Sequence, residues 1–273
     1  MDRIIEYMLA EDEGFADITS NAVVEKGLEV SAQIVSKDGG ILAGMDIIRQ
    51  VFEEYGIKVN FWMTDGSRIS KNDLLMSVAG DARTILLLER TVLNLSMRMS
   101  GVATAANRYV DLVKDYDVKV AGTRKTSPAI AKFDKYALTV GGADAHRFCL
   151  DDMVLIKDNH IATCESPLDA LLKAKANVSF SKKIEIEVET LDDAIECVKN
   201  GADIVMLDNM SPSEVSEVID MLNELGIRQN ALIEVSGGIT EDTIVDYAKL
   251  GVDIISIGAL THSSRSLNFS MRF

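Results

Sequence analysis

From about residue 117 onward, short runs of β-branched and aliphatic residues alternate with stretches that have helical spacing. The runs cover residues 118–123, 153–157, 184–188, 203–208, 231–236 and 253–258. They are apolar with little alternation, which is typical of parallel strands buried on both faces. The repetition of strand, turn and helix therefore predicts parallel βαβ units.

Start and stop signals flank the helical stretches. Serine caps a helix and proline fits its first turn, so three Ser-Pro pairs predict helix starts. The pairs are Ser127-Pro128, Ser166-Pro167 and Ser211-Pro212. Thr240 predicts a further start with a partial capping box, because Thr243 stands where glutamate is preferred. Helix ends are expected just before Gly201, Gly226 and Gly251.

Two arrangements of the parallel sheet fit this pattern, a closed barrel and an open doubly wound sheet. Nearly every predicted strand ends in polar residues or glycine, as in Thr123-Arg124-Lys125, Asp208-Asn209 and Ser236-Gly237-Gly238. A barrel would gather these ends on one face, where barrel enzymes keep their active sites. No G-x-G-x-x-G follows the first strand, which counts against a dinucleotide fold. The sequence therefore favours an α/β barrel.

The first hundred residues have a different pattern. Residues 28–44 and 58–80 look like antiparallel strands with Gly and Asp turns, and 45–56 has helical spacing. A long helix is expected over 82–114, and the alternating tail predicts a half-buried strand. We therefore predict an N-terminal domain over 1–102 and a barrel over 103–264, with the strand 265–273 returning to the first domain.

Composition limits the partners. The chain has 273 residues and a formal net charge of −15, which argues against general nucleic-acid or membrane binding, since both partners are anionic. The net charge does not exclude binding of a small anionic ligand, provided that the cations gather in one cleft. The three cysteines have neither zinc-ligand nor redox spacing, and the N-terminus turns acidic at once. We expect reduced, structural cysteines in a cytoplasmic protein without a membrane span.

Cations stand at consecutive predicted strand ends of this acidic chain. They are Arg124, Lys125, His146, Arg147 and Lys157. Arginine offers a planar fork for carboxylate or phosphate and lysine a compact charge, so together these residues predict a pocket for a multiply charged anion. For any one of them, a surface ion pair is the alternative; the clustering favours the pocket.

Two further groups lie at strand ends. Glycine-rich turns follow the last two strands at residues 236–238 and 258–259, where barrels often bind phosphate. The alternative is that these glycines only close the loops. Glu187 and Asp208 end adjacent strands, where carboxylates can bind sugar hydroxyls, hold Mg²⁺ or stabilise a developing cation. The alternative is that they neutralise Lys157 or Arg147. His160 is expected only to cap a turn, and His262 could line the phosphate loop.

Several motifs resemble the quinolinate phosphoribosyltransferase family over nearly the whole chain. They are ERTVLNLSMRMSGVAT, TRKTSP, GGADAHR, LIKDNHI, EIEVETL, IVMLDN, EVSGGI and SIGALTHS. The resemblance implies an N-terminal α/β sandwich followed by an incomplete parallel α/β barrel. It also implies transfer of phosphoribosyl from phosphoribosyl pyrophosphate to quinolinate, with Mg²⁺, giving nicotinate mononucleotide, pyrophosphate and CO₂. Homodimers with shared active sites are expected; whether they form hexamers is left open.

The resemblance also implies roles for single residues. The substrate quinolinate would be bound by Arg124, His146, Arg147 and Lys157, with Thr123 and Lys125 lining the pocket and Arg90 reaching in from the neighbouring subunit. Lys125 would face the pyrophosphate, and Glu187 and Asp208 would hold the ribose hydroxyls and Mg²⁺. The 5′-phosphate would lie against Ser236, Gly237, Gly238, Ile257, Gly258 and Ala259, with His262 nearby. Lys125, Lys157, Glu187 and Asp208 are the expected catalytic residues.

The chain departs from the family pattern at three positions, where Ala16, Ala129 and Ala143 replace usual glycines. Alanine tolerates fewer backbone conformations, so local loop geometry could differ there. These changes leave room for a paralogue that uses another heteroaromatic acid, such as the molybdenum-transport-associated proteins. A non-catalytic barrel that binds a phosphorylated ligand is a second alternative, against which the two carboxylates count.

Overall fold

The computed structural model describes residues 2–273, which form two compact units. The first unit holds residues 2–107, 126–142 and 260–273, and the second holds residues 108–125 and 143–259. The predicted boundaries placed 103–107, 126–142 and 260–264 in the barrel. Side chains far apart in sequence explain the difference: Arg98 forms a 2.8 Å ion pair with the buried Asp134, and its guanidinium also donates to the Thr261 carbonyl.

The first unit is built around an antiparallel sheet in the order β12-β1-β5-β3. Its strands are β1 (Glu29–Ser36), β3 (Lys58–Phe61), β5 (Leu74–Asp81) and β12 (Phe269–Arg272). A two-stranded sheet pairs β2 (Gly40–Ile41) with β4 (Arg68–Ile69). The tail strand β12 pairs antiparallel with β1, Phe269 opposite Ser36, so the predicted return of the C-terminal strand is confirmed.

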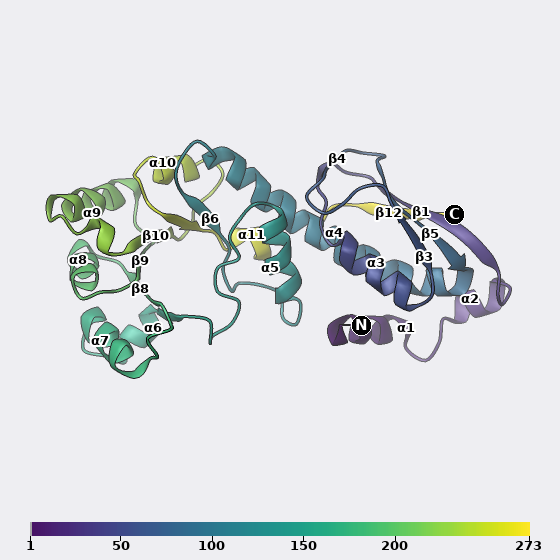
Figure 1. The fold of residues 1–273 in the computed structure, drawn as a ribbon, viewed down its shortest axis with the longest axis horizontal. Coiled ribbons are helices and arrows are strands. Elements are labelled where there is room, and N and C mark those ends of the chain that lie inside the picture. Colours follow the sequence, from purple (N-terminus) through teal and green to yellow (C-terminus); the bar gives the residue numbers. More distant parts are fainter. Residues whose placement is uncertain (1) are drawn as a thin grey trace. The chain divides into compact units, whose positions relative to one another are not determined.

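Helices complete the first unit (Figure 1). They are α1 (Arg3–Glu13), α2 (Ile18–Val23), α3 (Met45–Glu54), α4 (Ala82–Val113), α5 (Ala131–Val140) and α11 (Ala259–His262), of which α4 and α11 extend into the second unit. Helix α3 buries Ile48, Val51 and Phe52 and packs on β3. The expected helices over 45–56 and 82–114 are thus confirmed.

The second unit is a parallel sheet in the order β6-β11-β10-β9-β8-β7, with helices along its outer side (Figure 1). The strands are β6 (Lys119–Ala121), β7 (Val154–Ile156), β8 (Ile184–Val188), β9 (Ile204–Asp208), β10 (Leu232–Ser236) and β11 (Ile254–Ser256). The first strand pairs with the last, as in a barrel; a doubly wound sheet would reverse its order instead. Within the described chain β7 has no partner on its other side, so the predicted incomplete barrel is confirmed.

The helices of the second unit mostly follow the predicted signals. They are α6 (Asp158–Ile161), α7 (Pro167–Asn177), α8 (Leu191–Lys199), α9 (Pro212–Glu224), α10 (Ile244–Ala248) and the 3₁₀ turn η1 (Arg228–Asn230). Ser166 and Ser211 cap α7 and α9 through their hydroxyls, as predicted. Gly201, Gly226 and Gly251 follow helix ends with φ of 78°, 68° and 75°, which confirms the predicted stops.

Two predicted helix starts are wrong. Helix α5 begins at Ala131 rather than after Ser127, because Ala129 adopts a φ of 66°, which no helical residue can have. Helix α10 begins at Ile244, with Thr243 rather than Thr240 at the N-cap. The Thr243 hydroxyl nevertheless accepts the Thr240 amide at 3.0 Å, which is the bond of the predicted partial capping box, and holds a turn that precedes the helix.

Candidate active site

A polar cavity of about 420 Å³ lies at the carboxyl ends of the barrel strands. Inward-facing residues alternate along a strand, so the lining includes Met206 and Asp208 of β9 and Glu234 and Ser236 of β10. The cavity is lined by Gly122, Thr123, Arg124, Lys125, His146, Arg147, Leu155, Lys157, Asp158, Glu187, Met206, Asp208, Glu234, Ser236 and Ser256. This cavity therefore brings together most of the residues that the sequence singled out.

The remaining predicted residues lie elsewhere. Within the described chain, Gly237, Gly238, Ile257, Gly258 and Ala259 follow β10 and β11 in the same unit but do not line the cavity. Arg90 and His262 belong to the first unit. The roles predicted for these seven residues stay predictions.

Arg124 and Arg147 form the cationic part of the cavity. Arg147 is buried, and its guanidinium approaches the Met153 carbonyl at 3.5 Å. Burial, followed by the nearby Arg124 charge, lowers the pKa of Arg147. Among residues 2–273 neither arginine has a carboxylate within the 4.0 Å of an ion pair. Glu185, Glu187 and Asp152 act on Arg147 only from a longer range. Two clustered guanidinium groups without a carboxylate in ion-pair contact fit an anionic ligand better than a surface salt bridge.

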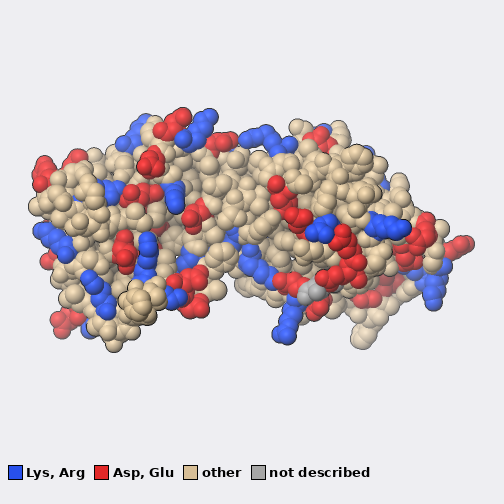
Figure 2. Space-filling view, in the orientation of Figure 1, with Lys and Arg blue, Asp and Glu red and all other residues tan. Residues whose placement is uncertain are grey.

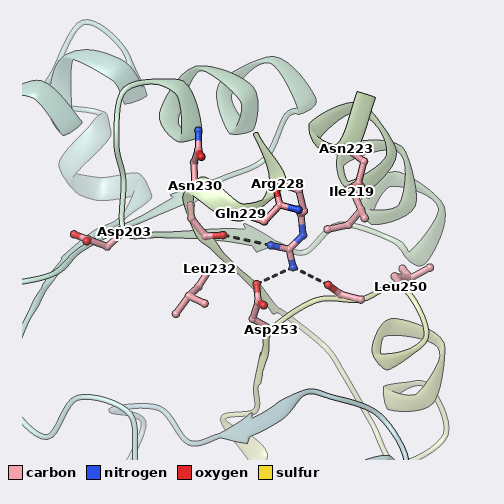
Figure 3. Close-up of a pocket in the computed structure, with 11 residues that line it drawn as sticks. Asp203, Ile219, Asn223, Arg228, Gln229, Asn230, Leu232, Leu250 and Asp253 are labelled. Atoms are coloured by element: carbon pink, nitrogen blue, oxygen red, sulfur yellow. Dashed lines mark hydrogen bonds and ion pairs between the residues drawn. The ribbon is translucent and has the colours of Figure 1, made fainter. Parts of the chain in front are cut away.

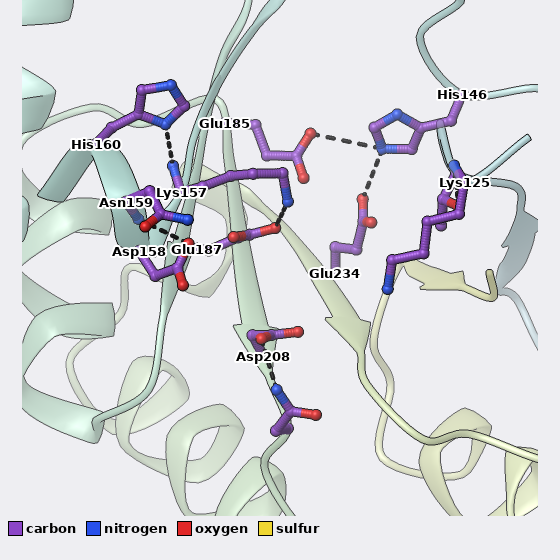
Figure 4. A network of polar contacts seen from close by, with 12 residues as sticks. Lys125, His146, Lys157, Asp158, Asn159, His160, Glu185, Glu187, Asp208 and Glu234 are labelled. Carbon is purple, nitrogen blue, oxygen red and sulfur yellow. Dashed lines mark hydrogen bonds and ion pairs between the residues drawn. The ribbon is translucent and has the colours of Figure 1, made fainter. Parts of the chain in front are cut away.

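Lys157 and Glu187 form an ion pair within the cavity. Figure 4 shows the lysine reaching from the end of β7 to the Glu187 carboxylate on β8. The Lys157 side chain is 44% exposed and that of Glu187 13%. Lys157 thus neutralises Glu187, which is the alternative that the sequence left open. Both side chains still face the cavity, where a ligand can contact them.

Asp208 ends β9, next to Glu187 on β8 and to Ser236 on β10. In the sheet register Asp208 lies opposite Ser236, and Glu187 lies opposite Met206. The Asn209 side-chain amide donates to Asp208 at 2.6 Å. The two carboxylates therefore face one cavity from adjacent strands, and their oxygens are the ligand type that Mg²⁺ prefers.

The turn after β10 requires glycine. Gly237 has a φ of 97°, and a β-carbon there would lie 2.2 Å from the Asn209 side-chain oxygen. Gly238 has a φ of 62° with open space around its α-carbon. A backbone that no side chain covers lets an anion approach its amides closely. This observation supports the predicted phosphate role of the 236–238 turn.

His160 is a capping residue, as expected from the sequence. Its ring Nδ1 accepts the backbone amide of Lys157 at 2.9 Å, at the start of α6. His146 lines the cavity, and both of its ring nitrogens have protein partners, so its predicted role in binding quinolinate stays a prediction. Nδ1 accepts the Arg147 amide at 2.9 Å, and Nε2 lies 3.2 Å from Glu234.

Sequence reasoning missed Glu185 and Glu234, whose carboxyl groups both point toward the His146 ring (Figure 4). Both are fully buried, and burial together with the charge of Glu234 raises the pKa of Glu185 to about 9. The period-2 pattern could have found them. Glu185 precedes the singled-out Glu187 by two residues, and Glu234 precedes Ser236 by two, so each pair shares a strand face.

A second cavity, of about 560 Å³, lies at the opposite ends of the strands (Figure 3). Arg228 crosses it and donates to Asp253 at 2.8 Å and to the Gly251 carbonyl at 2.7 Å. Asp253 also accepts the Ile233 amide at 2.6 Å. The polar groups of this cavity thus tie strands and loops together, which is the structural role expected at the amino-terminal face of a barrel.

Arg90 lies on α4 with its side chain 59% exposed. Its guanidinium approaches the carboxylate of Glu89 to 3.7 Å. Neighbours in sequence point about 100° apart on a helix, but the long, exposed Arg90 side chain can bend toward the half-buried Glu89. Because Arg90 is exposed, it needs no partner to offset burial.

In the part of the chain that the structure describes, the surface charge, the cysteines and the helices point to no further site. Basic and acidic side chains are intermixed on the face shown in Figure 2. Cys149, Cys164 and Cys197 are free thiols, as expected. Within the described residues, none of the helices combines the length and apolar character that a bilayer crossing requires.

Comparisons with known proteins agree with this geometry. The C-terminal domain model of quinolinate phosphoribosyl transferase matches residues 102–272, and the N-terminal domain model matches 17–100. A probable nicotinate-nucleotide pyrophosphorylase [carboxylating] of Methanocaldococcus jannaschii is 48% identical, over 98% of this chain and 95% of that protein. The nicotinate-nucleotide pyrophosphorylase [carboxylating] of Rattus norvegicus is 35% identical, over 92% and 84%.

A solved structure is similar over the full length of the chain. The crystal structure of NadC from Streptococcus pyogenes superposes with a TM-score of 0.93 at 36% identity, covering 100% of this chain and 95% of that one.

Proposed function

The chain belongs to the quinolinate phosphoribosyltransferase family, and on this premise we propose how the residues of the polar cavity carry out the family reaction. The reaction joins quinolinate to phosphoribosyl pyrophosphate and gives nicotinate mononucleotide, pyrophosphate and CO₂, a step of de novo NAD biosynthesis. The observation that carries the proposal is a single cavity in which the guanidinium groups of Arg124 and Arg147 lie with the carboxylates of Glu187 and Asp208.

Quinolinate has two adjacent carboxylates on a pyridine ring, which suits the cationic side of the cavity. Arg124 and Arg147 bind these carboxylates through their planar forks. Lys157 adds a third charge, for which the incoming carboxylate competes with Glu187. Thr123 precedes Arg124 and Lys125 in the loop after β6. Its hydroxyl accepts the Lys125 amide at 3.1 Å and so shapes the loop that carries these two cations.

Phosphoribosyl pyrophosphate occupies the glycine-rich side. Its 5′-phosphate lies against the backbone amides of Ser236, Gly237 and Gly238 and of the loop 257–259, with His262 nearby. Lys125 neutralises the pyrophosphate as it leaves. This assignment follows from the open backbone of Gly238 and from the barrel position of both loops.

Glu187 and Asp208 contact the ribose and hold Mg²⁺. Their carboxylates face one cavity from adjacent strands, and hard oxygen ligands of this kind fit Mg²⁺. The metal, when bound, supplies positive charge to the pyrophosphate. The residues themselves bind the ribose hydroxyls and offset the positive charge that develops on the sugar.

The mechanism is a displacement followed by decarboxylation. The pyridine nitrogen attacks ribose C1, the bond from C1 to the pyrophosphate oxygen breaks, and the new ring nitrogen is cationic. The ring carbon next to that nitrogen then loses CO₂, because the electron pair left behind lies beside a positive charge, and takes up a proton. Holding the two substrates in line contributes most of the rate, since few protons move.

Arg90 acts in the barrel of a second copy of the chain. It lies on an exposed helix face, with only its neighbour Glu89 as a carboxylate partner among the described residues. We therefore assign it to quinolinate binding across a homodimer with shared active sites. Free thiols, one of them the exposed Cys149, support a reducing, cytoplasmic location.

The test uses quinolinate with labelled carbon in its 2-carboxylate, phosphoribosyl pyrophosphate and Mg²⁺. We expect one labelled CO₂ for each nicotinate mononucleotide formed. Nucleotide formation from another heteroaromatic acid without CO₂ release, and none from quinolinate, would place the chain with a paralogous phosphoribosyltransferase. Binding of phosphoribosyl pyrophosphate without any turnover would favour a non-catalytic barrel.

A further inference from the structure

Two buried glutamates have no role in the mechanism above. Glu185 on β8 and Glu234 on β10 face the barrel interior, and neither side chain is exposed. Both carboxyl oxygens of Glu185 and one of Glu234 make no hydrogen bond within the described chain. Burial of a carboxyl group without hydrogen-bond partners costs free energy. We therefore expect these two glutamates to have a specific role.

Their neighbour in space is the ring of His146. Nε2 lies 3.2 Å from Glu234 Oε2 and 3.5 Å from Glu185 Oε2. On the other side of the ring, Nδ1 accepts the backbone amide of Arg147 at 2.9 Å. A neutral imidazole has one donor nitrogen and one acceptor nitrogen. Since Nδ1 accepts, the proton sits on Nε2, which donates to Glu234.

This tautomer decides between two uses of the cluster. Ligand atoms of His146, Glu185 and Glu234 lie within 4.8 Å of one another, close enough to consider a metal ion. A metal would need the lone pair of Nε2, which the proton occupies. The geometry therefore favours a hydrogen-bonded chain from Glu234 through His146 to Arg147 over a metal site.

The position of His146 depends on these hydrogen bonds. Its backbone has a φ of 54°, a left-handed conformation that costs free energy for a residue other than glycine. Asp144 accepts the His146 amide at 2.7 Å and helps to hold this turn. His146 and Arg147 also line another cavity, of about 590 Å³, in addition to the polar cavity.

We infer that Glu234 is a positioning residue for the anionic substrate: it orients the His146 ring, whose Nδ1 fixes the Arg147 amide and so the guanidinium that faces quinolinate. The inference rests on the proposed function for the identity of the substrate. His146 then links Glu234 on β10 to the backbone of Arg147, and the Glu185 carboxyl lies 3.5 Å from the same Nε2.

The test combines ring NMR with quinolinate binding. The chain has three histidines, so ¹⁵N-labelled histidine gives three pairs of ring nitrogen signals, which His160→Asn and His262→Asn assign. In the unsubstituted protein we expect His146 to carry its proton on Nε2. Glu234→Leu removes the acceptor and should redistribute the proton between the two nitrogens. It should also weaken quinolinate binding about tenfold by calorimetry, the effect of losing one hydrogen bond to a charged group.

Two comparisons separate positioning from a general structural effect. Glu234→Gln keeps an acceptor oxygen and should restore both the tautomer and the affinity for quinolinate to within about threefold. Glu189→Leu removes an exposed carboxylate after the same strand as Glu185 and should change neither. The KM for phosphoribosyl pyrophosphate should stay within about twofold in all three variants, because Arg147 does not face that substrate.

Several results would overturn the inference. They are a proton on Nδ1 in the unsubstituted protein, a Glu234→Leu variant that shifts the tautomer but binds quinolinate normally, and one that loses affinity while the tautomer stays. Equal losses for both substrates would also overturn it, since they indicate damage to the whole site. Absence of turnover in the unsubstituted protein counts against the proposed function instead, because the ring signals and the binding measurement do not require the reaction.

Discussion

Glu185→Gln is predicted to flatten the pH dependence of stability. Burial and the charge of Glu234 raise the pKa of Glu185 from the ordinary 4.5 to about 9. Between these values the folded protein keeps a proton that the unfolded chain has lost. The free energy of unfolding therefore falls as pH rises from about 4.5 toward 9, and the stabilisation present below 4.5 is lost above 9.

The size of the effect follows from one proton. Its slope is at most about 1.4 kcal/mol per pH unit, which gives up to about 2.7 kcal/mol between pH 6 and pH 8. Glutamine has no proton to lose, so this slope should disappear in Glu185→Gln. Urea unfolding followed by circular dichroism at pH 6, 7 and 8 measures the difference.

The matched control is Glu189→Gln, because Glu189 is exposed and directly follows the same strand. This variant should keep the slope of the unsubstituted protein. If Glu185→Gln keeps that slope as well, the buried carboxyl does not hold a proton in the folded state, and the reasoning is refuted.

Three further predictions concern the loops and the reaction. Ala129→Gly should raise the free energy of unfolding by up to about 1 kcal/mol, because alanine at a φ of 66° is strained, whereas Ala174→Gly inside α7 should lower it; thermal melts check both. Asp208→Asn should lower kcat at least about tenfold with an unchanged circular dichroism spectrum, and an unchanged kcat would leave Asp208 a structural role only. Arg90→Ala and Lys157→Ala homodimers should be nearly inactive, yet subunit exchange between them should recover roughly a quarter of the activity, and no recovery despite exchange would argue against a shared site.

Much of the barrel could be predicted because its signals are local. The run 184–188 forms β8 with the predicted bounds, and Ser166 and Ser211 cap helices as serine before proline should. The strand ends carry the cations and carboxylates to one cavity because parallel strands share a direction. Pattern and polarity were sufficient for this part of the site.

Other features depend on contacts that no local pattern shows. Residues 126–142 belong to the first unit through pairs such as Arg98 with Asp134, which lie 36 positions apart. The start of α5 depends on the left-handed turn at Ala129, where the sequence has no glycine to signal it. The contacts of His146 with Glu185 and Glu234 could not be predicted, because glutamates on other strands cannot be assigned to it from sequence.

The central claim is that the arginines of the polar cavity recognise the two carboxylates of quinolinate. Calorimetry of quinolinate and of nicotinate, which lacks the 2-carboxylate, with the unsubstituted protein and with Arg147→Ala tests it most directly. We expect Arg147→Ala to weaken quinolinate binding by about tenfold to a hundredfold, the effect of losing hydrogen bonds to a charged group, and nicotinate binding by less than about threefold. Equal weakening for the two acids, or none for quinolinate, would contradict the claim.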